Sequence, residues 1–162
     1  MKYPHTGLFH FCLQLGNTLL KNIDDEKEGI QFFLPQSVKS FFPVNTNSKH
    51  IKFWHKILTP STNNISVWHA THQDTNYFPF SKNVPVVLTI HDLNYFNDLT
   101  KSSAKKDGFI KSLKKKVEAA SHLTFISNFS LQDFEQYIPL NNKPYSIIYN
   151  GCNINEVEEL QS

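Results

Sequence analysis

The apolar runs in the second half of the chain are short and continuous. Residues 65–68 (ISVW), 86–90 (VVLTI) and 123–126 (LTFI) are apolar throughout, apart from a Ser or Thr in each. Half-buried strands alternate between apolar and polar positions, whereas continuous runs of this length are typical of strands buried on both faces of a parallel sheet. We therefore predict a largely parallel sheet, with 145–149 (YSIIY) as its last strand.

Apolar residues at helical spacing mark segments before and between these strands. They recur every three or four positions over 8–21 and over 103–121, which predicts two amphipathic helices. A third helix is predicted after 126, where Ser130 and Asp133 have the spacing of a capping box. Strands that alternate with helices predict an α/β domain.

The first third of the chain carries weaker signals. Apolar runs at 30–35 and 50–54 predict two further strands. A domain of this class normally begins with a central strand, but only MKYPH precedes Thr6-Gly7, and this segment is too short and too polar to form one. We expect that the first strand is missing from this chain or that Met1 is not the natural start.

Composition and charge exclude some classes of function. The chain has 162 residues, of which 40% are hydrophobic and 19% charged, so it can form one domain with a core and is not globally disordered. The net charge is +2, and all 16 basic residues are lysine. Arginine is the usual residue for bidentate contacts to bases and phosphates. We therefore expect no nucleic-acid partner.

The cysteines and the absence of export signals indicate the compartment. Cys12 and Cys152 are far apart and form no CxxC pair, and no apolar stretch is long enough to span a bilayer. The N-terminus lacks the apolar core of a signal peptide. We predict a cytoplasmic protein. The lysines between 105 and 116 form either a solvated helix face or a contact with anionic lipid, which leaves peripheral membrane association open.

Polar side chains gather where the predicted strands end. In open parallel sheets, ligands bind outside the carboxyl ends of the strands, so this clustering predicts a ligand site on one edge of the sheet. The residues that follow strands are His69, His72, Asp74, His91, Asp92, Ser127, Asn128, Asn150 and Gly151.

Each of these residues has an alternative without a functional role. Asp92 has the position of an aspartate that accepts a bond from its own backbone two residues on. His69 and His72 are either ordinary polar loop residues or metal ligands joined by His91 or Asp92, but their spacing lacks the zincin glutamate. We predict no metal. Ser127 lacks the glycines of a nucleophile elbow.

Several segments occur together in a combination found in a known family. They are TGLFHFCLQLGNTLL (6–20), VWHATHQDTNYFP (67–79), VPVVLTIHDLNYF (84–96), ASHLTFISNFSLQDF (120–134) and YSIIYNGCN (145–153). In this order they resemble the N-terminal half of retaining glycosyltransferases of the GT-B fold, the family-4 group that uses nucleotide-sugar donors. The resemblance implies a Rossmann-like three-layer domain, one half of a GT-B fold.

The resemblance also implies a division of labour between two domains. Residues 1–153 would be the N-terminal, acceptor-side domain, and 154–162 would begin the linker to a C-terminal donor-binding domain that is absent here. The donor would be a nucleotide-diphosphate sugar, with no cofactor, and the acceptor a glycan or a lipid-linked glycan. Because a leaving diphosphate needs positive charge to stabilise it, we expect this chain to be inactive alone and the full-length protein to be the enzyme.

The residues nearest the chemistry follow from the same resemblance. A loop histidine of the family contacts the donor sugar near the reaction centre, and either His69 or His72 matches it. His91 and Asp92 match the pair that lines the acceptor side of the cleft. Asp92 is a candidate orienting group or base.

Other matched residues lie farther along the chain. Gly7, with Thr6 before it, matches the glycine whose backbone approaches the donor diphosphate. Ser127 matches a serine at the start of a helix. Asn150 and Gly151 match the junction into the donor domain.

Two other classes of function remain open. One is a stand-alone, non-enzymatic α/β binding or interaction domain. The other is a hydrolase or epimerase that uses His69, His72, His91 and Asp92, with a metal among its possible parts. A fragment without its first strand and partner domain would also expose apolar surface, so we expect self-association.

Overall fold

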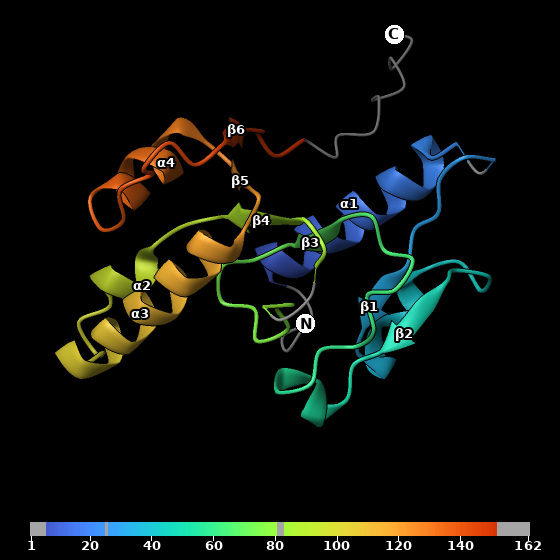
Figure 1. Ribbon diagram of the computed structural model, residues 1–162, viewed down its shortest axis with the longest axis horizontal. Coiled ribbons are helices and arrows are strands. Elements are labelled where there is room, and N and C mark those ends of the chain that lie inside the picture. The colour runs from blue at the N-terminus through green and yellow to red at the C-terminus, as the bar shows by residue number, and fades with distance from the viewer. Residues whose placement is uncertain (1–5, 25, 81–82, 152–162) are drawn as a thin grey trace, which may run out of the picture. The chain divides into compact units, whose positions relative to one another are not determined.

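The computed structural model describes residues 6–24, 26–80 and 83–151 of the chain (Figure 1). The structure divides into two compact units, Met1–Ser61 and Thr62–Ser162, called the first and second units below. The predicted linker at 154–162 lies outside the described residues, as does any strand before Thr6.

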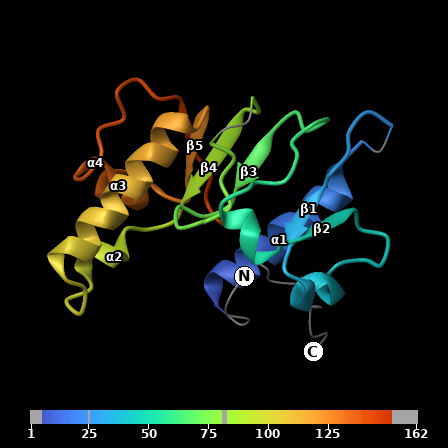
Figure 2. The ribbon, with the colours of Figure 1, turned by 60° about the horizontal axis from the view of Figure 1, so that its bottom comes forward.

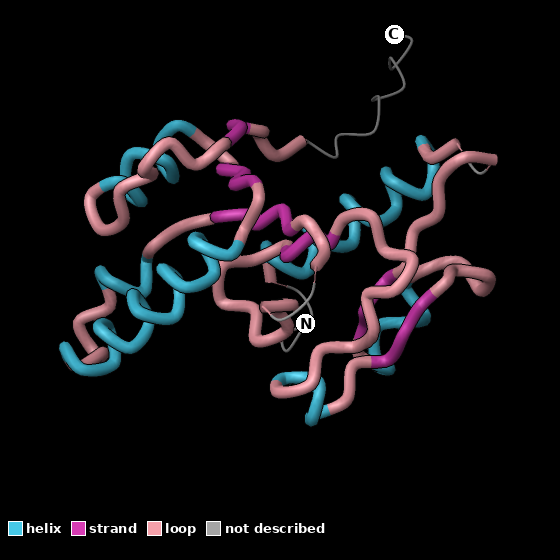
Figure 3. The backbone as a smooth tube through the Cα atoms, in the orientation of Figure 1, coloured by secondary structure: helices cyan, strands magenta, loops and turns pink. Residues whose placement is uncertain are grey.

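The first unit combines a helix with a small parallel sheet. Strands β1 (Phe32–Leu34) and β2 (Ser48–His50) pair in parallel (Figure 3). Helix α1 (Gly7–Asn22) confirms the helix predicted over 8–21. The strand predicted at 50–54 is wrong over most of its length. The other elements of this unit are the 3-10 helices η1 (Gln36–Phe41) and η2 (Phe53–Lys56).

Phenylalanine rings dominate the core of the first unit. Phe9 of α1 and Phe42 are buried together with Leu34 and Val38. Gly16 lets α1 approach these rings, because a Cβ built on it would lie 2.7 Å from Cε1 of Phe42. The helix therefore packs through a position where a side chain has no room.

The second unit carries the predicted parallel sheet. Its described strands pair in the order β3-β4-β5-β6, and every pairing is parallel. The α/β class and the largely parallel sheet are thereby confirmed. The elements are β3 (Trp68–Ala70), β4 (Val86–Ile90), α2 (Asn94–Asn97), α3 (Ser103–Ala119), β5 (His122–Phe125), α4 (Asn128–Glu135) and β6 (Tyr145–Ile147).

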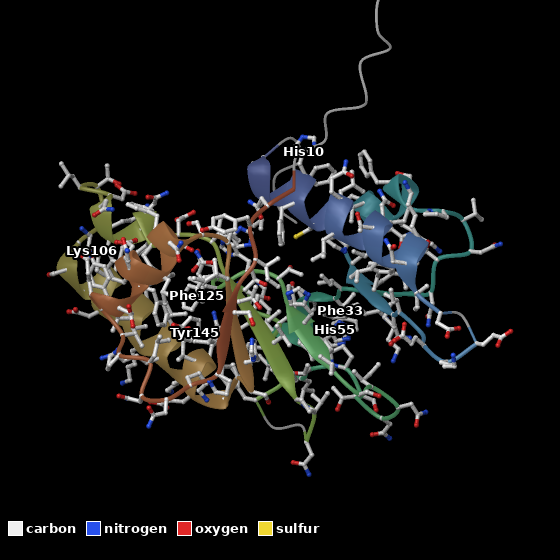
Figure 4. All side chains as sticks on the ribbon, turned by 90° about the horizontal axis from the view of Figure 1, so that it is seen from above. His10, Phe33, His55, Lys106, Phe125 and Tyr145 are labelled. Carbon is white, nitrogen blue, oxygen red and sulfur yellow. The ribbon has the colours of Figure 1, made fainter. Side chains whose placement is uncertain are left out.

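Helices α3 and α4 lie on the same side of this sheet (Figure 2). Both are crossover connections between neighbouring parallel strands, and right-handed crossovers that advance in one direction place their helices on one face. The core forms between them and the strands. Phe125 packs edge-on against Phe134 of α4, with the ring centroids 5.2 Å apart. It also packs edge-on against Tyr145 of β6, with the ring centroids 6.0 Å apart (Figure 4).

Two element boundaries differ from the sequence predictions. β3 was predicted at 65–68 but is Trp68–Ala70, so His69 lies inside the strand and not after it. The capping box of α4 was predicted at Ser130 and Asp133, but Ser127 is the N-cap. The Ser127 backbone is extended, and its Oγ accepts the Ser130 N–H at 3.0 Å while Ser130 Oγ accepts the Ser127 N–H at 3.1 Å.

Among the described helices, none combines the length and the apolar character that crossing a bilayer would require.

Candidate functional site

The loops after β3 and β4 bring together the polar residues predicted to form a site. These two strands are parallel neighbours, with Ala70 opposite Leu88, so their carboxyl ends open onto the same edge of the sheet. The rings of His72 and His91 lie there with their centroids 5.4 Å apart. We call His72, Gln73, Asp74, His91 and Asp92 the histidine cluster.

A buried glutamine joins the two loops of this cluster. Gln73 is only 3% exposed. Its Oε1 accepts the backbone N–H of His91 at 3.1 Å, and its Nε2 donates to the carbonyl of Asp92 at 2.6 Å. Because both side-chain groups are bonded to the facing loop, Gln73 sets the distance between His72 and His91. The sequence pattern gave no indication of Gln73, because a glutamine in a polar loop carries no periodic signal.

A lysine from α3 is hydrogen-bonded to the same loop. Lys116 is 7% exposed, and its Nζ donates to the backbone carbonyl of Gln73 at 2.7 Å. Burial lowers the pKa of Lys116, and the nearby charge of Asp74 opposes that shift. The prediction that Lys116 belongs to a solvated or lipid-facing lysine surface is therefore wrong. Lys106 is also engaged, because its Nζ donates to the Phe96 carbonyl.

His72 is held as a neutral imidazole. Its Nδ1 accepts the backbone N–H of Asp74 at 3.1 Å, so the neutral ring carries its proton on Nε2. Burial lowers the pKa of His72 to about 4, helped by the positive charges of His91 and Lys116 and opposed by Asp92. The site therefore offers a neutral N–H donor near pH 7.

His91 and His69 differ in what they can reach. His91 Nε2 donates to the Thr71 carbonyl at 2.9 Å, and burial lowers its pKa against the opposing effects of that bond and of Asp92. His69 lies in β3, and its Nε2 pairs with Thr89 Oγ1 at 2.8 Å. Desolvation, then the charge of His91, lowers the pKa of His69. Of the two histidines that matched the family position, only His72 lies in the loop after the strand.

Asp92 accepts a hydrogen bond from its own backbone two residues on, which is the structural role given above as the alternative to a functional one. Its Oδ1 accepts the Asn94 N–H at 3.0 Å, two residues on, which closes the turn into α2. The residue remains exposed to solvent. Asp74 is also exposed at the surface, and the neighbouring protein raises its pKa by desolvation, opposed by Lys116.

A small cavity adjoins the cluster. Its volume is about 210 Å³, below the few hundred Å³ at which pockets for whole small ligands begin. It can take one part of a larger ligand. Its lining comes from the loop after β3, from Tyr95 and from α3, and comprises Gln73, Asp74, Asn76, Tyr95, Phe109, Ser112, Leu113 and Lys116.

The remaining predicted residues of the second unit follow β5 and β6. Ser127 caps α4 through its hydroxyl. Asn128 Nδ2 donates to the hydroxyl of Tyr149 at 2.8 Å, which ties the start of α4 to the segment after β6. Asn150 and Gly151 are exposed. These residues share an edge of the sheet with the histidine cluster but follow the neighbouring strands.

Thr6 and Gly7 belong to the first unit and are described only within it. Thr6 is the N-cap of α1, where its Oγ1 accepts the Phe9 N–H at 3.3 Å. A Cβ added to Gly7 would meet no atom within 4 Å. The first turn of α1 is therefore open around this glycine.

Within residues 6–24, 26–80 and 83–151, no three His, Cys, Asp or Glu side chains gather as ligands for a metal ion.

Comparison with known proteins identifies one family. The sequence model described as Glycosyltransferase Family 4 matches residues 25–156, which span all of β1 to β6 and the histidine cluster. Comparison with curated proteins and with solved structures finds no match.

Proposed function

The chain belongs to glycosyltransferase family 4, and from this membership we propose that it is the acceptor-side domain of a retaining glycosyltransferase. The transferred sugar would come from a nucleotide-diphosphate sugar and go to a glycan or a lipid-linked acceptor. The observation that carries the proposal is the pairing of His72 with His91 at the strand-end edge, 5.4 Å apart.

His72 is proposed to contact the donor sugar. Its neutral ring, with Nδ1 occupied by the Asp74 N–H, presents Nε2–H to a sugar hydroxyl. Positive charge develops at the anomeric carbon as the diphosphate leaves. A histidine whose pKa is about 4 positions the sugar without adding a like charge next to that carbon. Fixed donors of this kind lower the barrier because they need no reorganisation during the reaction.

His91 and Asp92 are proposed to form the acceptor wall. Gln73 holds both through backbone bonds, so their side chains project from a fixed loop. Asp92 uses Oδ1 to close the turn into α2, and its exposed carboxylate would accept a hydrogen bond from an acceptor hydroxyl. This assigns Asp92 the role of orienting the acceptor.

A departing diphosphate needs positive charge near it. The histidine cluster does not present such a charge to a ligand. Lys116, the lysine of this site, has its Nζ bonded to the Gln73 carbonyl, and the imidazole of His72 is neutral near pH 7. Helix N-termini and cations stabilise a departing diphosphate. We therefore expect the 162-residue chain by itself to give no turnover, with donor binding completed by a donor-side domain.

A transfer assay with radiolabelled nucleotide sugars tests the proposal. It is run on the 162-residue chain and on the product of its complete reading frame, with membrane and glycan extracts as acceptors. We expect label transfer by the complete product. Replacing His72 by Ala should lower kcat by about a hundredfold, the usual loss when one fixed donor is removed.

His122→Gln is the matched control, because His122 lies in β5 and pairs with Ser146. It should change kcat less than about threefold. Failure of the complete product to transfer any sugar, while it still binds a glycan, would instead support a non-enzymatic binding domain. An unchanged kcat of the complete product carrying His72→Ala would contradict the role given to His72.

A further inference from the structure

A short segment of the first unit exposes large apolar side chains. Phe53 and Trp54 of η2 are 80% and 45% exposed, and Ile57 and Leu58 just after it are 87% and 70% exposed. Burying such side chains is the main driving force of folding, so a run of them left in water indicates a surface that contacts something else. We call residues 53–58 the apolar turn.

Local contacts fix the apolar turn in this orientation. His55 points inward and packs on Phe33 of β1 with the ring centroids 5.2 Å apart (Figure 4). Its Nδ1 also accepts the backbone N–H of Lys52 at 3.0 Å. Because His55 is the inward anchor, its neighbours Phe53 and Trp54 are directed to solvent. The exposure therefore follows from how η2 is attached to β1.

The charge around the apolar turn has one sign. Lys49, Lys52 and Lys56 are all exposed, and the Nζ of Lys52 lies 5.0 Å from the centre of the Trp54 ring. No Asp or Glu occurs between residues 29 and 73. Within the first unit, the segment 26–29, which follows α1 and holds Glu26 and Glu28, lies far from η2 (Figures 1 and 2). A partner of this surface should be anionic.

We propose that the apolar turn and its three lysines bind the surface of an anionic phospholipid bilayer. Trp and Phe are suited to the boundary between headgroups and acyl chains, with Ile and Leu inserted beside them. Lysine stems lie along the apolar layer while their ammonium groups reach the lipid phosphates. An acidic protein partner would offer carboxylates to the lysines, but the four exposed aliphatic and aromatic side chains fit a hydrocarbon layer.

Helix α3 differs from the apolar turn, although its lysines are the ones for which the sequence left a contact with anionic lipid open. Lys105, Lys111, Lys114 and Lys115 are exposed on it. Among the described residues, however, no large apolar side chain of α3 is exposed. It can therefore add attraction to anionic headgroups but has nothing to insert. The apolar turn has both features.

Vesicle cosedimentation of the full chain tests the proposal. The probes are vesicles of phosphatidylcholine with an equal share of phosphatidylglycerol, and vesicles of phosphatidylcholine alone. We expect binding to the mixed vesicles that weakens with salt, and a blue shift of Trp54 emission that the Trp54→Phe variant loses. Phe53→Ser combined with Ile57→Ser should reduce affinity more than about tenfold, because two apolar side chains no longer leave water. Lys56→Glu should reduce it about fivefold or more.

Leu99→Ser is the matched control, since Leu99 is 95% exposed in the second unit and should leave vesicle affinity unchanged. All these positions are exposed, so circular dichroism should show unchanged folding. Absence of binding to the mixed vesicles overturns the proposal, and so does unchanged affinity of the Phe53→Ser/Ile57→Ser variant. A concentration-dependent dimer that this double variant abolishes, without vesicle binding, would instead make the apolar turn an interface between two copies of the chain.

Discussion

Apolar side chains are usually buried and polar side chains usually exposed. Each unit departs from this rule, but with a different kind of side chain. The second unit buries the polar residues Gln73, Thr89, Lys116 and Ser130, and each of them has a hydrogen-bond partner. The first unit instead exposes four large apolar residues within six positions, at Phe53, Trp54, Ile57 and Leu58, whereas Leu99 and Phe129 of the second unit are exposed singly. Single exposed apolar residues are common, but buried polar groups and clustered exposed apolar groups are informative. Here Gln73 and Lys116 lie at the histidine cluster, and Phe53 and Ile57 lie in the apolar turn, so both departures occur at surfaces proposed to bind ligands.

Because the two units depart from the rule in different ways, they should be sensitive to different kinds of substitution. Buried polar bonds are costly to break because the remaining partner cannot return to water, so the second unit should respond strongly to removal of one group. The first unit has a ring-filled core and should respond more to added volume than to lost bonds. Variants that remove or add a single group in each unit test this contrast.

The largest effect is expected from Lys116→Ala. This variant removes the bond to the Gln73 carbonyl and the packed lysine stem, and it should lower the free energy of unfolding by about 3 kcal/mol. Urea denaturation monitored by circular dichroism measures it. Lys115→Ala, at the exposed neighbouring position, is the control and should stay within about 0.5 kcal/mol of the parent. Equal losses in the two variants would contradict the supporting role of Lys116.

Acidification should destabilise the second unit through His72. The pKa of His72 in the folded chain is about 4, against 6.5 for a free imidazole. Between those values the unfolded chain binds more protons, so stability is complete above about pH 6.5 and falls as the pH drops toward 4. We expect His72 to account for a loss of about 2 kcal/mol over this range, allowing for partial solvent screening.

The contribution of His72 is isolated by comparison with His72→Gln. Burial also lowers the pKa values of His69 and His91, whereas the raised pKa of Asp74 acts in the opposite direction. Urea titrations at several pH values should therefore show a shallower decline for the Gln variant than for the parent. Parallel curves for the two proteins would mean that His72 titrates normally in the folded state.

The smallest effect concerns two helical glycines, one in each unit. Gly16→Ala places a Cβ 2.7 Å from a Phe42 ring atom, and the resulting strain should outweigh the gain in helix propensity, giving a net loss of about 1 kcal/mol. Gly108→Ala, in α3, meets no atom within 4 Å and should gain up to about 1 kcal/mol. Thermal unfolding of both variants measures the difference. A gain for Gly16→Ala would show that the aromatic core of the first unit yields easily.

Periodicity predicted the main elements of the second unit well. Strand β4 runs from Val86 to Ile90 as predicted. A short, continuous apolar run bounded by Pro85 and His91 is typical of a buried strand. Helix α3 was found within its predicted range. The predictions were poorer in the first unit, where 50–54 combines apolar residues with lysine and His. There the 3-10 helix η2 forms around the packing of His55 on Phe33, a contact that no local pattern encodes.

The order of apolar and polar residues along the chain is enough to place polar side chains after apolar strands, and parallel pairing then brings these side chains to one edge of the sheet. The sequence also carried the family resemblance, which the family match over 25–156 supports. That His69 lies within a strand while His72 faces His91 is evident only in the folded chain, because this distinction depends on the register of β3 against β4. The tertiary structure also revealed Gln73 and Lys116 as a bonded pair. They are 43 residues apart in sequence, and a bond over that separation depends on how α3 packs beneath the loop.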